Sequence, residues 1–258
     1  MKDRFLDRPR PLMEHFRELK SRLLRVGIVG LVFTIGAIIF YEPIFKILER
    51  PAGDALNPTL GGKLAQLDVT ETWSTIARVG IIVGLSCTLP YFLFELVAFI
   101  RPALKPSERR WAYVLIPAGL VSFALGVAFG YFVLLPPAIR FLLTFGSEIA
   151  EPVVRISTYV NLIIALMFWM GVVFEIPLVM FFLGRLGVLK GKWVAKQRRW
   201  ALLLAFVLGA IITPTADPVN QSLVAGPIIV MYEIGLWLVR LSEWLRARKA
   251  ARLARAAG

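Results

Sequence analysis

The sequence predicts an all-α integral membrane protein with six transmembrane helices and both termini on the cytoplasmic side. Hydrophobic residues make up 58% of the 258 residues and the mean hydropathy is +0.71, which is too apolar for a soluble domain. Most of the 30 lysines and arginines fall in four hydrophilic segments, at residues 1–25, 101–110, 185–199 and 240–258. Because cationic segments beside membrane spans stay in the cytoplasm, this alternation places both ends and two loops inside.

Six apolar runs are candidates for the spans, because a helix needs about 20 apolar residues to cross a bilayer. They are residues 23–41, 76–100, 111–135, 159–184, 200–212 and 223–239. We expect spans five and six to be short, since they offer only about 13 and about 17 residues for a hydrocarbon core of about 30 Å. Thinning of the bilayer, or shielding by longer helices, would accommodate them.

We expect the chain to form one membrane domain. Residues 1–22 make an amphipathic cytoplasmic N-terminus, 23–239 the six-span core, and 240–258 a basic cytoplasmic tail. The outward segments are 42–74, which has room for short helices at 44–48 and 69–75, then 136–158 and 213–220.

Four prolines fall inside predicted spans, where each removes an amide donor and bends its helix. They are Pro90, Pro117, Pro177 and Pro227. Four bent helices predict a concave body.

Three glutamates also lie within predicted spans, where a charged group is costly and is a functional candidate by default. Counted from the cytoplasmic ends of their spans, Glu95, Glu175 and Glu233 lie about 8, about 13 and about 9 Å deep at 1.5 Å per residue. A shared cavity open to the cytoplasm would hydrate all three. Alternatively, each is protonated or hydrogen-bonded as a contact between helices. Glu175 is the strongest functional candidate, because it is the deepest and lies two residues before Pro177.

Two further carboxylates lie among the cytoplasmic cations. Residues 11–25 have the spacing of an amphipathic helix, in which Glu18 and Arg22 are four residues apart and can pair. In the segment 101–110, Ser107 can cap the third span and place Glu108 in its first turn, where the helix dipole stabilises an anion. Besides these structural roles, a carboxylate at the membrane surface can receive an incoming guanidinium through two parallel hydrogen bonds.

The sequence lacks the motifs of enzymes and cofactor sites. His15 and Cys87 are the only histidine and cysteine, so no metal cluster or disulfide is expected. The basic residues border apolar runs, which argues against nucleic-acid binding. We therefore expect no enzyme activity, no cofactor and no metal, and we expect a partner or the membrane potential to power any work on a substrate.

Several separated stretches carry a family resemblance. They are residues 11–23, 98–110, 174–177, 210–223 and 232–235. In this order they resemble the TatC family, the multispanning receptor subunit of the twin-arginine, or Sec-independent, protein translocase. The resemblance implies six spans in the inner (cytoplasmic) membrane with both termini in the cytoplasm.

The resemblance also implies a function and partners. The chain would bind the twin-arginine signal peptides of folded proteins at its cytoplasmic face and nucleate a complex that exports them, using the proton motive force. The implied partners are TatA- and TatB-like single-span subunits, membrane lipids and further copies of the chain.

Particular residues match the signal-peptide site of the family. The acidic residues that engage the paired arginines match Glu18 and Glu108, and an aromatic position beside the loop matches Phe99. Lys20 stands where arginine is common, and Phe16 is a second departure from the family pattern. Lys20 keeps the charge but lacks the planar fork of a guanidinium, which weakens any two-pronged role at that position.

The intramembrane polar residues allow two interpretations. By resemblance, Glu175 matches a membrane glutamate of the family, while Asp217 and Gln221 match polar positions where the single-span partners dock. The alternative is a proton- or ion-coupled small-molecule transporter that uses Glu95, Glu175 and Glu233 as a relay. A lipid-modifying enzyme is the weakest option, because no cluster of His, Asp or Ser is present.

Overall fold

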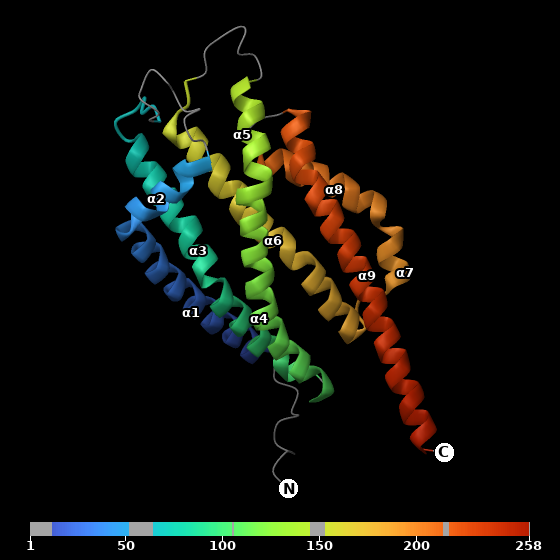
Figure 1. Cartoon of the computed structure of the whole chain (residues 1–258). Helices are drawn as coiled ribbons and strands as arrows, with labels where there is room; N and C mark the ends of the chain where they lie inside the picture. Colours follow the sequence, from blue (N-terminus) through green and yellow to red (C-terminus); the bar gives the residue numbers. More distant parts are fainter. Residues whose placement is uncertain (1–11, 52–63, 105, 145–152, 214–216, 258) are drawn as a thin grey trace.

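The protein is described by a computed structural model that covers residues 12–51, 64–104, 106–144, 153–213 and 217–257 (Figure 1). Within these residues the secondary structure is helical, apart from one isolated β-bridge between Ala65 and Arg155. The all-α prediction is therefore confirmed for the described part. The main helices are α1 (Leu12–Ile39), α2 (Tyr41–Glu49), α3 (Glu71–Ile100), α4 (Pro106–Phe129), α5 (Leu135–Thr144), α6 (Ile156–Leu186), α7 (Gly191–Lys196), α8 (Arg198–Ile212) and α9 (Pro218–Ala257).

Five helical segments among the described residues are long and apolar enough to cross a membrane. They are Phe16–Ile39, Glu71–Ile100, Tyr113–Thr144, Ile156–Leu186 and Pro218–Arg248. The predicted fifth span corresponds to α8, which has only 15 residues and is as short as the sequence suggests. A sixth crossing by α8 stays a prediction.

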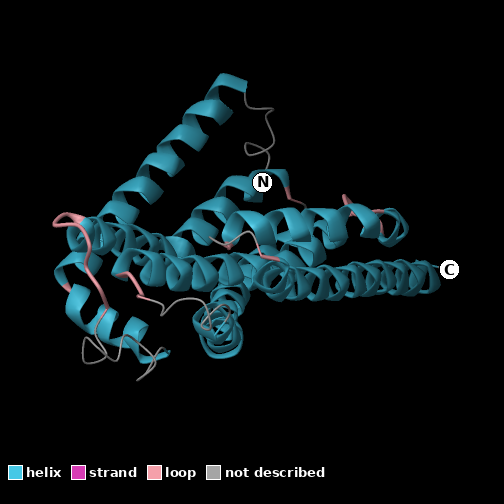
Figure 2. Cartoon of the chain, turned by 90° about the horizontal axis from the view of Figure 1, so that it is seen from above, coloured by secondary structure: helices cyan, strands magenta, loops and turns pink. Residues whose placement is uncertain are grey.

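The chain runs back and forth along one axis. In Figure 1 the first turns of α1, the start of α4 and the last turns of α9 lie at the lower end of the bundle, while α2 lies across the upper end. The chain climbs through α8 before α9 descends. Figure 2 shows the C-terminal part of α9 extending beyond the other helices. An even number of passes would place the two ends of the chain on one side in this way.

Two predicted boundaries need correction. The sixth helix is not short, because α9 has 40 residues and continues far past the apolar run into the basic tail. The second outward loop does not begin at Pro136, because Pro136 and Pro137 lie in the first turn of α5. Each of these prolines removes an amide donor from a helix that is continuous with α4 through a π-helical turn, a local adjustment by which membrane helices tolerate proline. A π-helical turn at Gly130–Leu134 joins α4 to α5 and lets the segment continue.

The N-terminal part of the described chain is a single helix. The amphipathic segment and the first span form one continuous helix of 28 residues, α1. Of the two predicted helices in the first outward loop, 44–48 lies in α2, and most of 69–75 lies in the first turns of α3. The four prolines predicted to bend spans all lie inside helices, in α3, α4, α6 and α9.

The core is centred on α6, which packs against α3, α4, α8 and α9. Helices approach one another at small residues, as expected where lipid removes the hydrophobic drive between spans. A Cβ atom on Gly126 of α4 would clash with the Met170 carbonyl oxygen of α6. A Cβ atom on Gly84 of α3 would lie 2.7 Å from the Thr34 Cα of α1. At these two contacts the helix backbones themselves nearly touch.

A buried carboxylate joins two segments that were predicted to lie on the outward side. Glu71, at the start of α3, is 5% exposed and accepts hydrogen bonds from the Leu67 amide at 2.9 Å and from the Ser157 hydroxyl of α6. The Arg155 Nε lies 3.5 Å from the same carboxylate. Backbone bonds on either side of Ala65 complete the contact. The beginnings of α3 and α6 are thereby held together.

We predict that Gly126→Ala destabilises the protein by about 1–3 kcal/mol, because the added methyl meets backbone of α6 that cannot rotate away. Thermal unfolding of the purified protein in detergent would measure the effect. Gly36→Ala is the matched control: it lies in α1, has nothing within 4 Å of its Cβ position, and should be neutral or slightly stabilising. Equal effects of the two substitutions would contradict the close α4–α6 approach.

Candidate functional site

Glu18 lies in the second turn of α1 and holds a guanidinium. Arg22, one turn later, donates to Glu18 Oε1 from Nη2 at 2.7 Å and from Nε at 3.3 Å. Both side chains are about one-fifth exposed, at 21% for Glu18 and 18% for Arg22. The carboxylate expected to bind a peptide arginine therefore already binds an arginine of its own chain.

Glu95, near the end of α3, contacts the other end of the Arg22 guanidinium. Its side chain is 4% exposed, and its carboxylate has three donors: Arg22 Nη1 at 2.6 Å, Arg25 Nη1 at 3.0 Å and the Tyr91 hydroxyl at 2.9 Å. A buried carboxylate is tolerated only when it is paired and hydrogen-bonded in this way. Glu95 is thus a charged contact between α1 and α3, which was one of its two possible roles in the sequence.

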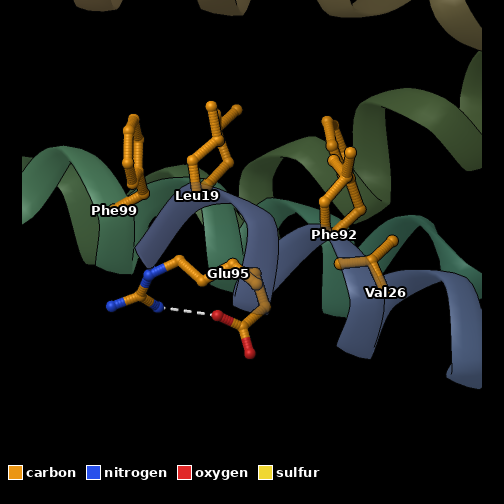
Figure 3. A pocket seen from close by; sticks show the side chains of 8 residues that line it. Leu19, Val26, Phe92, Glu95 and Phe99 are labelled. Atoms are coloured by element: carbon orange, nitrogen blue, oxygen red, sulfur yellow. Dashed lines mark hydrogen bonds and ion pairs between the residues drawn. The ribbon is translucent and has the colours of Figure 1, made fainter. Parts of the chain in front are cut away.

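An apolar pocket borders this charged contact. It has a volume of about 40 Å³ and is lined by Leu19 and Val26 of α1, by Phe92 and Phe99 of α3, and by the stems of the paired residues. In Figure 3, Phe92, Phe99 and Leu19 project to one side while Glu95 points to the other. Phe99 is half-buried, so the aromatic residue singled out in the sequence forms part of an apolar surface next to the Arg22–Glu95 pair.

Three further predicted residues, Lys20, Ser107 and Glu108, lie in α1 and in the first turn of α4. Lys20 is exposed on α1. The Glu108 side chain lies outside the described residues, although its backbone lies in the first turn of α4. Ser107 is not the cap of that helix as predicted, because α4 already begins at Pro106. Leu104 is 5% exposed and packs with Val97, which fixes the turn that leads into α4.

Glu175 occupies a different setting. It lines a cavity of about 250 Å³ between α3, α4 and α6 whose other lining residues are apolar, among them Leu93, Leu115 and Phe182. Its Oε1 atom is buried and has no hydrogen-bond partner among the described residues. A Cβ atom on Gly119 of α4 would lie 3.3 Å from its Oε2 atom, so α4 leaves space for the carboxylate. Glu175 thus places a carboxylate oxygen that lacks a hydrogen-bond partner among the described residues in an otherwise apolar hollow.

The predicted residues of α8 and α9 make contacts within the chain. Glu233 pairs with Arg198 at 2.6 Å on a partly exposed surface. Asp217 accepts hydrogen bonds from the Asn220 amide at 2.7 Å and from its side chain at 3.0 Å, so it caps α9. Gln221 donates to the Phe206 carbonyl of α8 at 2.8 Å. A docking role for Asp217 and Gln221 stays a prediction.

The shared cavity expected for the three glutamates is absent from the described part of the structure. Glu95 faces α1, Glu175 lines the hollow beside α6, and Glu233 pairs across to α8. Depth along a helix does not specify direction around it, and these residues lie on differently facing helices. Arg25 and Tyr91 were not among the predicted site residues, although Tyr91 precedes Glu95 by one helical turn and could have been found from that spacing.

Comparison with known proteins assigns the chain to a family. A family model described as Sec-independent protein translocase protein (TatC) matches residues 14–227. The chain belongs to the TatC family. It is 32% identical over 237 residues to TatC of Carboxydothermus hydrogenoformans, covering 91% of this chain and 94% of that protein. It is 34% identical over 235 residues to TatC of Aquifex aeolicus, covering 90% of this chain and 95% of that protein.

A solved TatC structure agrees with the fold. The crystal structure of the twin-arginine translocase receptor TatC matches with a TM-score of 0.79 at 32% identity, covering 89% of this chain and 99% of that one. Another match is the chloroplast TatC of Pisum sativum, which is 31% identical over 237 residues, covering 92% of this chain and 65% of that protein. The resemblance noted in the sequence is therefore confirmed as TatC family membership.

We predict that Glu175→Leu raises the thermal unfolding temperature by about 2–6 °C, because it replaces a carboxylate lacking a described partner with an apolar side chain in an apolar hollow. The control is Glu233→Leu, which removes a carboxylate paired with Arg198 and should give no such rise. Differential scanning fluorimetry of the purified variants would measure both. A marked fall for Glu175→Leu would mean that this carboxylate stabilises the fold.

Proposed function

We propose that this chain is the receptor and core subunit of a twin-arginine translocase. It binds the paired arginines of signal peptides on folded proteins at its cytoplasmic face and nucleates the complex that exports them. The observation that carries the proposal is the Glu18 carboxylate, which is partly exposed, lies beside an apolar pocket and already accepts two hydrogen bonds from a guanidinium.

Glu18 and Glu108 act as a pair of arginine receptors in this proposal. The helices that carry them, α1 and α4, both begin at the lower end of the bundle in Figure 1. A charge-assisted hydrogen bond contributes about 1.5–3 kcal/mol, more than an exposed ion pair. Two such sites select Arg-Arg over Lys-Lys by geometry, because only a guanidinium offers a planar fork to a carboxylate.

The apolar surfaces give the rest of the signal peptide a place to lie. The pocket at Phe92 and Phe99 lies beside Glu18, and the larger hollow at Glu175 lies between α3, α4 and α6. An apolar segment that follows the paired arginines passes from the first to the second. Glu175 then meets a polar group of the bound peptide or of a partner, which is why a lone carboxylate is kept there.

The proposed complex lies in the inner membrane and contains TatA- and TatB-like single-span subunits, lipids and further copies of the chain. The single-span subunits dock on α8 and α9 near Asp217 and Gln221, where the short α8 leaves less apolar length than neighbouring helices. The proton motive force drives transport, and the chain itself is not an enzyme. The transporter alternative is not favoured, because Glu95, Glu175 and Glu233 lie apart and form no relay.

We predict that Glu18→Ala and Glu108→Ala each reduce photocrosslinking of an Arg-Arg signal peptide by about tenfold or more. The photoreactive group is placed at Phe99, and a Lys-Lys peptide gives the background. Glu42→Ala is the control, since it removes an exposed carboxylate at the opposite end of the bundle. Undiminished crosslinking in both variants would rule out this assignment of the site.

A second prediction concerns topology with six spans and both termini inside. In a Cys87→Ser background, which removes the only cysteine, Lys192→Cys should react with an impermeant maleimide only from the cytoplasmic side. Ser222→Cys, beyond α8, should react only from the opposite side, as should Val69→Cys before α3. Labelling of Lys192→Cys and Ser222→Cys from the same side would show that α8 does not cross the membrane.

A further inference from the structure

Arg22 bridges an exposed acid and a buried one. Its Nη2 and Nε atoms hold Glu18 Oε1 at 2.7 and 3.3 Å, while its Nη1 atom lies 2.6 Å from Glu95 Oε2. One guanidinium therefore occupies the Oε1 atom of the carboxylate that the proposed function assigns to the signal peptide. A peptide arginine that binds Glu18 in the same geometry meets a site already filled by the chemistry it offers.

We propose that Arg22 is an internal competitor for the arginine site, so that signal-peptide binding is an exchange of one guanidinium for another. This inference rests on the proposed function and adds a residue that sets its affinity. In the free receptor Arg22 binds Glu18. In the bound receptor the peptide's guanidinium takes Glu18, and Arg22 keeps only its contact with Glu95.

The buried side of the network makes the exchange possible. Arg22 does not lose all its partners on leaving Glu18, because its third nitrogen is already bound to Glu95. Glu95 in turn keeps Arg25 and Tyr91 throughout. No charge is stranded in the interior at any point, so Arg22 gives up only its two hydrogen bonds to Glu18 in the exchange. A pair of this kind, at i and i+4 and partly exposed, is weak enough for a peptide guanidinium to displace.

Competition of this kind lowers the affinity of every peptide for Glu18. It does not change which peptide binds more tightly. A ligand whose site is free for only a fraction of the time has its affinity reduced by that fraction, whatever the ligand is. Arg22 therefore weakens Arg-Arg and Lys-Lys peptides by the same factor. Ligands that bind weakly fall below useful affinity, while a full twin-arginine signal still binds. The predicted cytoplasmic segments are rich in lysine and arginine. The lowered affinity therefore keeps weakly bound cations from occupying Glu18.

The test is the affinity of a fluorescent signal peptide for the full chain in detergent or nanodiscs, measured by anisotropy. Arg22→Gln should tighten binding of both Arg-Arg and Lys-Lys peptides by about twofold to fivefold, with their ratio unchanged. Arg22→Lys should also tighten binding, because an ammonium cannot hold both carboxylates with one planar group. Arg17→Gln is the matched control: it removes an exposed arginine adjacent to Glu18 and should have a smaller effect.

Two outcomes would overturn the inference. Weaker binding by Arg22→Gln would make Arg22 a residue that positions Glu18, and an equal gain from Arg17→Gln would reduce the effect to general charge. In a Glu18→Ala background, Arg22→Gln should change nothing, and a persistent gain would place the competition elsewhere. Failure of the proposed function looks different, since Glu18→Ala alone would then bind the Arg-Arg peptide normally. Thermal unfolding of each variant identifies any that fail to fold.

Discussion

The close approach of other helices to α6 determines most of this structure. Two apolar helices in lipid gain little from hiding their surfaces, so they associate where small residues allow backbones to meet. Gly126 lets α4 reach the Met170 carbonyl on one side of α6. Near the end of α6, Gly184 leaves room for Ser242 and the Val239 backbone of α9. Once α4, α6 and α9 are set, α3 packs beside α6 and carries α1 on its outer face.

This arrangement separates two kinds of intramembrane charge. Glu95 is surrounded by donors from its own helix and from α1, so it serves as a joint between helices. Glu175 lies in an apolar hollow formed by the same packing, and its Oε1 atom has no partner within the described residues. A buried charge whose hydrogen bonds are all made stabilises the contact between helices. A buried charged group without a partner lowers stability, so its presence indicates a functional role. The sequence distinguishes the two glutamates only by depth and by a nearby proline, whereas the structure gives them opposite surroundings.

The sequence was sufficient to predict the helices and the family, and insufficient to predict what surrounds each charge. Apolar length located the long helices α1, α3, α4, α6 and α9 and the short α8, because burial in lipid requires a continuous run, whereas α5 and α7 were not predicted. The predicted helix boundaries are wrong where the helix is longer than its apolar run. The helix α9 continues through a basic tail, and α5 includes Pro136 and Pro137 in its first turn. The partners of Glu95 were not predictable from depth alone, because they depend on how α1 rotates against α3. Glu18 and Arg22 were predicted to pair from their spacing, but the second bond of Arg22 links residues 73 positions apart in the chain.

The continuity of α1 has a mechanical consequence. The helix has 28 residues, or about 42 Å, and carries Glu18 near one end and the connection to α2 at the other. It packs mainly against α3, and much of its surface is exposed. A rod attached along one flank turns as a unit, so a shift of its first turns is carried to the opposite side of the bundle without any chain of side-chain rearrangements. A displacement of the first turns of α1, where Glu18 lies, would therefore tilt the whole helix and move its connection to α2.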